Sequence, residues 1–109
     1  MATVYKVLGQ SNPSATTATT LYTVPSSTST VVSTITVANL GGSSATYRIS
    51  VRPAATAQTN AMYIAYDVTV GANDTTTLTV GLTLAATDVI TVYASSATVA
   101  FNAYGSEIA

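Results

Sequence analysis

The sequence predicts an all-β fold: a single-domain antiparallel β-sandwich of jelly-roll type with about eight strands. Three observations lead to this prediction. Apolar and polar residues alternate with a period of two, which places every second side chain on the same face of a strand. Turn-forming residues separate these segments, and no segment shows a helical repeat with a clear cap. With 109 residues the chain can bury one hydrophobic core, so we expect residues 1–109 to form one domain.

Six segments alternate clearly, and two weaker ones complete the predicted set. In residues 46–52 the side chains of Tyr47, Ile49 and Val51 point to one face, which predicts a half-buried strand. In residues 62–70 the apolar set includes Tyr66. Because Tyr47 and Tyr66 both fall on the apolar sides of their strands, we assign both to the core. The eight segments cover residues 4–8, 21–24, 30–40, 46–52, 62–70, 77–84, 88–94 and 98–104.

The predicted connections contain residues typical of turns and loops. Residues 39–42 and 71–74 contain asparagine and glycine, which tolerate positive φ, so both are predicted to be hairpin turns. The polar segment 54–60, which follows Pro53, is long enough to cross from one sheet to the other. Residues 11–20 have few bulky side chains and are expected to form an extended loop or arm.

The absence of two residue types, cysteine and histidine, narrows the possible chemistry. The chain contains no cysteine, so it has no disulfide, thiolate metal site or cysteine nucleophile. It contains no histidine either, which removes the commonest general base and the commonest metal ligand.

Charged residues are scarce and hydroxyl groups are abundant. Only 6% of the residues are charged, where about 25% is usual, and threonine and serine make up about a third of the chain. Neutral hydroxyls cost far less to bury than ions do. This composition favours a protein that lives in a permanent assembly, and a secreted adhesin would tolerate it as well.

The charge and hydropathy patterns also exclude several partners. Three basic residues are too few to neutralise the phosphates of a nucleic acid. Threonine, serine or aspartate interrupts every apolar run well before the roughly 18 residues of a membrane span. The segment 1–6 lacks the basic region and apolar run of a secretory signal. We therefore expect neither a nucleic-acid partner nor a membrane association, and no signal peptide.

The ionisable side chains do not suggest a catalytic or metal site. Asp74 and Asp88 fall in turns or at strand starts, where an aspartate ordinarily caps its own backbone, so they do not indicate a glycosidase pair. Lys6, the candidate base for a serine nucleophile, has no motif around it. The nearest approach to a calcium loop, Asn73–Asp74, fits a turn better. We expect a protein that is not an enzyme and has no cofactor. The ionisable residues are Lys6, Arg48, Arg52, Asp67, Asp74, Asp88 and Glu107.

Four residues are candidates for contact with a partner. Arg48 and Arg52 lie four apart on one strand, hence on one face and about 13 Å from each other, a spacing that suits a clamp on a partner's carboxylates. They also suit a merely solubilising role on an exposed face. Tyr63 and Tyr93 lie opposite the apolar sets of their strands, and tyrosine is favoured at interfaces because it offers a flat apolar face with a polar tip.

Two stretches of the chain carry a resemblance to a known family. The first comprises residues 8–13, 21–25, 34–39 and 47–54, and the second comprises residues 63–67, 82–94 and 104–108. Together they resemble small virion structural proteins of tailed phages, particularly cyanophages. The resemblance covers nearly the whole chain in order and implies a β-sandwich component of the particle, placed either on the capsid or at a tail or fibre. No catalytic motif accompanies it.

These observations favour a capsid decoration or cement subunit that bridges neighbouring capsid subunits in the virion. Its partner would be the major capsid protein or another virion protein, and a trimer or dimer would match the symmetry of the lattice. A tail, baseplate or fibre-associated protein is the alternative. A carbohydrate-binding or adhesive module is the third hypothesis, and it requires exposed aromatic rings beside Asp or Asn side chains, such as Tyr63 beside Asp67.

Overall fold

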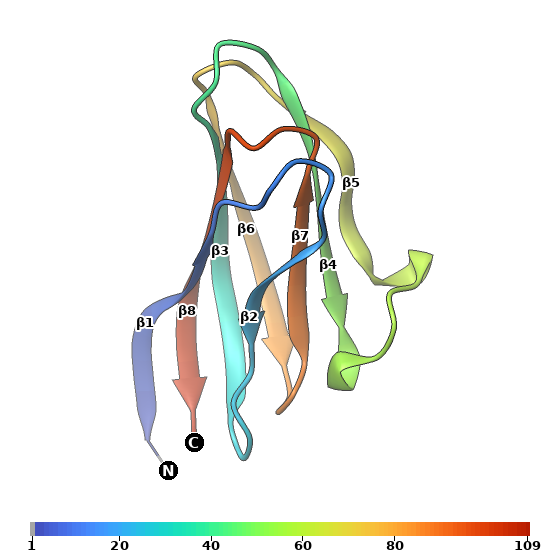
Figure 1. Ribbon diagram of the computed structural model, residues 1–109. Coiled ribbons are helices and arrows are strands. Elements are labelled where there is room, and N and C mark those ends of the chain that lie inside the picture. Colours follow the sequence, from blue (N-terminus) through green and yellow to red (C-terminus); the bar gives the residue numbers. More distant parts are fainter. Residues whose placement is uncertain (1) are drawn as a thin grey trace.

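The computed structural model describes residues 2–109, and its strands form two four-stranded antiparallel sheets (Figure 1). This confirms the predicted all-β sandwich of about eight strands. Two short 3-10 turns, η1 (Pro53–Ala55) and η2 (Asn60–Met62), lie between the fourth and fifth strands. No helix in residues 2–109 has the length and apolar character to span a membrane. The strands are β1 (Thr3–Ser11), β2 (Thr19–Thr23), β3 (Ser29–Asn39), β4 (Ala45–Arg52), β5 (Tyr63–Val70), β6 (Thr75–Leu84), β7 (Val89–Ala94) and β8 (Val99–Ile108).

The strand order is that of a jelly roll. Sheet A has the order β1-β8-β3-β6, and sheet B has the order β2-β7-β4-β5. The first strand pairs with the last, the second with the seventh, the third with the sixth and the fourth with the fifth. Folding the chain into one long antiparallel ribbon and wrapping that ribbon around a core produces this nested pairing, which defines the double-sheet jelly roll.

This topology corrects three predicted connections. Residues 39–42 link β3 to β4 and residues 71–74 link β5 to β6, and in both cases the two strands lie in different sheets, so neither segment is a hairpin turn. Residues 54–60, predicted to cross between sheets, instead join β4 and β5, which are neighbours in sheet B. Turn residues show that the chain reverses, but the pairing partner of each strand depends on contacts far away in sequence.

The core lies between the sheets and contains the predicted inward faces of most strands. Tyr47 and Ile49 of β4 are fully buried, as are Ile35 and Val37 of β3. The ring of Tyr47 meets Phe101 edge-to-face, with a centroid distance of 6.1 Å and an interplanar angle of 75°. The assignment of Tyr47 to the core is therefore confirmed.

The assignment of Tyr66 to the core is wrong. Its side chain is 55% exposed, and Ile64 and Val68 on the same strand are also exposed. The pairing of β4 with β5 shifts register between Tyr47 and Ile49, so that two residues of β5, Tyr66 and Asp67, oppose Arg48 alone. Asp67 has φ of 50° within this bulge. A bulge of this kind interrupts the alternation of side chains, which is why a period-two pattern misassigns the residues beyond it.

The boundaries of the predicted elements differ most from the observed ones in two regions. Residues 11–20 were expected to form a loop or arm, but Ser11 belongs to β1 and Thr19 begins β2, so only residues 12–18 connect the strands. This connection is tied to the sandwich, because the Asn12 amide donates to the carbonyls of Ala97 and Val99. The last strand, predicted for residues 98–104, continues to Ile108 and pairs with both β1 and β3.

A buried asparagine fastens one end of the sandwich. Asn39, at the end of β3, is 2% exposed. Its side-chain oxygen accepts bonds from the backbone N–H of Gly41 at 3.0 Å and from the Thr98 hydroxyl at 2.8 Å, and its amide donates to the carbonyl of Ser43 at 2.7 Å. A longer bond reaches the Val70 carbonyl at 3.4 Å. One side chain thus joins three sheet-crossing loops.

A second buried polar cluster joins the sheets at the other end. The hydroxyl of Tyr22 in β2 donates to Glu107 of β8 and lies 2.8 Å from the Thr30 hydroxyl of β3. Glu107 also pairs with Lys6 at 3.3 Å. Burial and the neighbouring carboxylate raise the pKa of Tyr22 to about 12, and the hydrogen bond from Tyr22 lowers the pKa of Glu107. The neutral phenol and the ionised carboxylate are therefore the stable pair.

We expect Asn39→Ala to lower the free energy of unfolding by about 2–3 kcal/mol, because it leaves two partly buried donors and two carbonyl acceptors without their partner. Urea denaturation measures the change. Asn102→Ala is the matched control, since the Asn102 side chain accepts its bond from Gln10 on the exposed surface. Equal losses in the two variants would contradict the role assigned to Asn39.

The stability of the fold should fall between about pH 10 and pH 12. Tyr22 has its folded-state pKa raised above the ordinary value of 10.0, so its contribution is complete below pH 10 and is lost as the pH rises through about 12. Tyr22→Phe should remove part of this alkaline loss, and Tyr47, whose pKa burial also raises, contributes in the same direction. Unfolding curves at several pH values measure it, with exposed Tyr5→Phe as the control. An unchanged alkaline slope in Tyr22→Phe would contradict the assignment.

Candidate binding site on the outer face of sheet B

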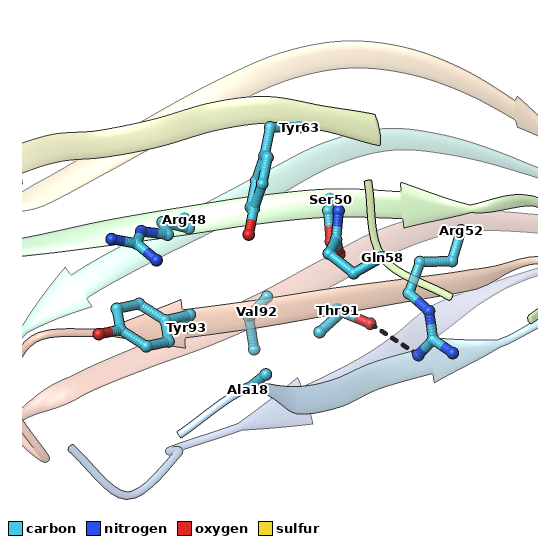
Figure 2. Close-up of a pocket in the computed structure, with 9 residues that line it drawn as sticks. All are labelled: Ala18, Arg48, Ser50, Arg52, Gln58, Tyr63, Thr91, Val92 and Tyr93. Atoms are coloured by element: carbon cyan, nitrogen blue, oxygen red, sulfur yellow. Dashed lines mark hydrogen bonds between the residues drawn. The ribbon is translucent and has the colours of Figure 1, made fainter. Parts of the chain in front are cut away.

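The four predicted contact residues all lie on the outer face of sheet B, around one hollow (Figure 2). Tyr47 and Ile49 of β4 point inward, so Arg48 and Arg52 point outward, as predicted. The register sets Arg48 directly opposite Tyr93 of β7, and Tyr63 of β5 opposite Ser50 of β4. The central strand β4 therefore carries the polar side chains, and its two neighbours supply the aromatic rings.

Arg48 is held by a carboxylate and two aromatic rings of its own chain. Its guanidinium donates to Asp67 through two nitrogens, at 2.7 Å and 3.3 Å. Its central carbon lies 4.3 Å from the ring centroid of Tyr66 and 4.4 Å from that of Tyr93. Asp67, followed by the smaller effects of the two tyrosines, raises the pKa of Arg48 above its usual range. Arg48 is thus the centre of a closed intramolecular cluster.

Arg52 has different surroundings. It donates to the backbone carbonyls of Thr56 at 2.8 Å and Ala55 at 3.1 Å, and its remaining terminal nitrogen lies 3.5 Å from the Thr91 hydroxyl. All these acceptors are neutral. The spacing of Arg48 and Arg52 in the sequence suggests an equivalent pair, but their surroundings differ. The charge of Arg48 is compensated by Asp67, and the charge of Arg52 has no carboxylate beside it.

The hollow between these residues has a volume of about 120 Å³. Tyr63 and Tyr93 stand on one side of it and Arg52 on the other, and the hydroxyl end of Tyr63 points into it (Figure 2). Its polar lining includes Ser50, whose hydroxyl donates to the side-chain oxygen of Gln58. A second, more open hollow of about 330 Å³ lies beside it and is lined by Asn60, Tyr63 and Tyr66.

Sequence reasoning missed three members of this face. Tyr66 was assigned to the core, and Asp67 was paired with Tyr63 although its carboxylate binds Arg48. Gln58 lies in the loop that was expected to cross between sheets. A possible signal was the Tyr66–Asp67 dipeptide itself, since aspartate is among the few residues that adopt positive φ and can mark a bulge inside a strand.

The other ionisable groups serve the backbone or an ion pair. The Asp74 carboxylate accepts the N–H of Thr75, and the Asp88 carboxylate accepts those of Ala85 and Ala54, so both cap local backbone as predicted. Within residues 2–109, no three acidic side chains lie close enough together to hold a metal ion. What this face offers to a ligand is therefore aromatic surface, amide and hydroxyl groups and one cation.

No protein-family model, curated protein or solved structure matches this chain. Its class follows from its own architecture: it is an eight-stranded jelly-roll domain with an aromatic and polar surface on the outer face of one sheet. Jelly rolls serve as viral capsid and lectin domains among other roles, so the fold alone does not select the function.

Proposed function

We propose that the chain is a structural protein of a tailed-phage virion, without catalytic activity, that decorates the capsid and bridges neighbouring capsid subunits. The observation that supports this proposal most is the outer face of sheet B. It gathers Tyr63, Tyr66 and Tyr93, the residue type most suited to a protein interface, around one arginine whose charge is already neutralised. The Arg48 cluster therefore costs little free energy to desolvate.

The charge distribution also supports a permanent assembly. Lys6 pairs with Glu107, and Arg48 pairs with Asp67, so most of the few charges on the molecule are already compensated. The surface between them is rich in hydroxyl groups, which a partner can hydrogen-bond without paying the large desolvation cost of free ions. The resemblance of two sequence stretches to virion proteins of tailed phages agrees with this assignment.

A decoration role explains how so small a domain is kept on a particle. Binding to a lattice stabilises the folded subunit by mass action, because the lattice binds the folded state alone. Capsid sites carry two-fold or three-fold symmetry, so we propose that the subunit occupies them as a dimer or a trimer. Its partner is then the major capsid protein or another virion protein.

Adding the purified protein to heads assembled without it tests this function. We expect saturable binding in a number of copies set by the capsid symmetry, together with greater resistance of the heads to heat. The readouts are the bound copies per head and the temperature at which packaged DNA is released. If heads do not bind the protein and antibodies label the tail of the intact particle, the capsid role is excluded and a tail, baseplate or fibre role replaces it.

A carbohydrate-binding function is the second candidate, and one observation favours it. The open hollow beside the Arg48 cluster is lined by Asn60, Tyr63 and the exposed Tyr66. The rings of Tyr63 and Tyr66 meet edge-to-face with centroids 4.8 Å apart. An aromatic ring beside an amide is the combination with which proteins commonly hold the face and the hydroxyls of a sugar.

A glycan array probed with the purified protein tests the second candidate. Under this function, binding to at least one neutral glycan is expected, with a loss of about tenfold or more in Tyr66→Ala, because one stacking surface disappears. Tyr104→Ala, on the other sheet, is the matched control and should bind normally. An array without signal above background would remove the carbohydrate hypothesis and leave the capsid proposal unaffected.

A further inference from the structure

Arg52 is the one basic side chain in residues 2–109 without a carboxylate partner. Lys6 and Arg48 form ion pairs with Glu107 and Asp67. No carboxylate oxygen lies within the 4.0 Å that defines such a pair around Arg52, whose hydrogen bonds go to two carbonyls and one hydroxyl. A guanidinium has five N–H donors, so donors remain free for a further acceptor.

The loop after β4 holds Arg52 in a fixed orientation. The carbonyls of Ala55 and Thr56 both accept from its guanidinium. In the loop that brings these carbonyls to Arg52, Ala54 and Ala55 adopt φ of 52° and 57°. This left-handed conformation is unfavourable for alanine. Asp88 supports this conformation by accepting the backbone N–H of Ala54 at 2.8 Å. The cation is therefore oriented in advance, at the expense of local strain.

The hollow beside Arg52 has the size of one small side chain. Its volume of about 120 Å³ is several times what one water molecule needs. Tyr63 and Tyr93 provide apolar walls suited to methylene groups, and Ser50 and Gln58 lie between these walls and Arg52 (Figure 2). A carboxylate carried by one or two methylene groups fits this hollow, with the methylene groups against the tyrosine rings and the carboxylate toward Arg52.

We propose that this hollow receives one aspartate or glutamate side chain of a partner protein, whose carboxylate pairs with Arg52. This inference rests on the proposed function in one respect, namely that a protein surface covers sheet B. Covering that surface removes water from Arg52, and a buried charge without a counter-ion is strongly unfavourable. The partner therefore has to supply a carboxylate, because none of the carboxylates in residues 2–109 pairs with Arg52.

The proposal also divides the roles of the two arginines. Sequence spacing suggests that Arg48 and Arg52 clamp two carboxylates together. In the structure Arg48 already has Asp67 on its guanidinium and a tyrosine ring on either side. Arg52 alone is left to recognise an acidic residue, and Arg48 positions the aromatic wall.

Nuclear magnetic resonance with two matched peptides tests the inference on the full chain. The chain has only two arginines, so its two side-chain Nε–H signals are easily assigned. The probes are the peptide acetyl-Gly-Glu-Gly-amide and its neutral counterpart acetyl-Gly-Gln-Gly-amide. We expect the acidic peptide to shift the Arg52 signal and to leave the Arg48 signal in place, and the neutral peptide to shift neither. No Arg52 shift, or equal shifts with both peptides, would overturn the inference.

Binding to heads gives the second readout. Arg52→Gln should weaken binding about tenfold or more and should make the affinity less dependent on salt concentration. Arg52→Lys should retain part of the affinity and part of its salt dependence. Lys6→Gln removes one positive charge elsewhere and is the control for net charge. If wild-type protein binds heads and Arg52→Gln binds equally well, the inference is wrong and the proposed function stands. If wild-type protein binds no heads but the acidic peptide shifts Arg52, the proposed function is wrong and the carboxylate site stands.

Discussion

The buried hydrogen bonds of Asn39 are the interaction on which the jelly roll depends most. Apart from β4 and β5, every pair of consecutive strands lies in different sheets, so the chain has to cross the gap between them repeatedly. Asn39 joins three of these crossings at one end through Gly41, Val70 and Thr98. Tyr22 and Glu107 fasten the sheets at the other end. These two polar clusters join the sheets at opposite ends of the apolar core.

The surroundings of Arg48 on the outer face of sheet B depend on a bulge in β5, which is one of several register shifts in the two sheets. Without the bulge in β5, Tyr66 would take the position opposite the inward-pointing Ile49, and Asp67 alone would oppose Arg48. With it, both residues lie beside Arg48 and complete a cluster that neutralises its charge. Bulges that redirect side chains are common next to binding sites. Arg52, four residues along β4, lies outside this cluster and is held by the loop after β4 and by Thr91.

Much of the fold could be predicted because alternation is a local property of the chain. Tyr47, Ile35 and Val37 point inward as their positions in the pattern require. The placement of Arg48, Arg52 and Tyr93 on one outer face follows from the same parity. Tyr63 lies on that face as predicted, but it does so through a second register shift, between Ile49 and Ser50. The failures share one cause. Tyr66 and the connections after Asn39 and Gly71 depend on which strands pair and in which register, and that information lies in contacts between distant residues.

The sequence by itself determined the all-β class, the number of strands and the scarcity of charge, because periodicity and composition act residue by residue. Only the tertiary structure decided that strands adjacent in sequence separate into different sheets, that Asp67 neutralises Arg48, and that Arg52 keeps its charge beside a hollow. Arg48 and Arg52 lie on the same face of one strand but have different surroundings, since the free energy of a charge is set by the groups around it in space. Those groups come from β5, β7 and the loop after β4, which the fold alone brings together.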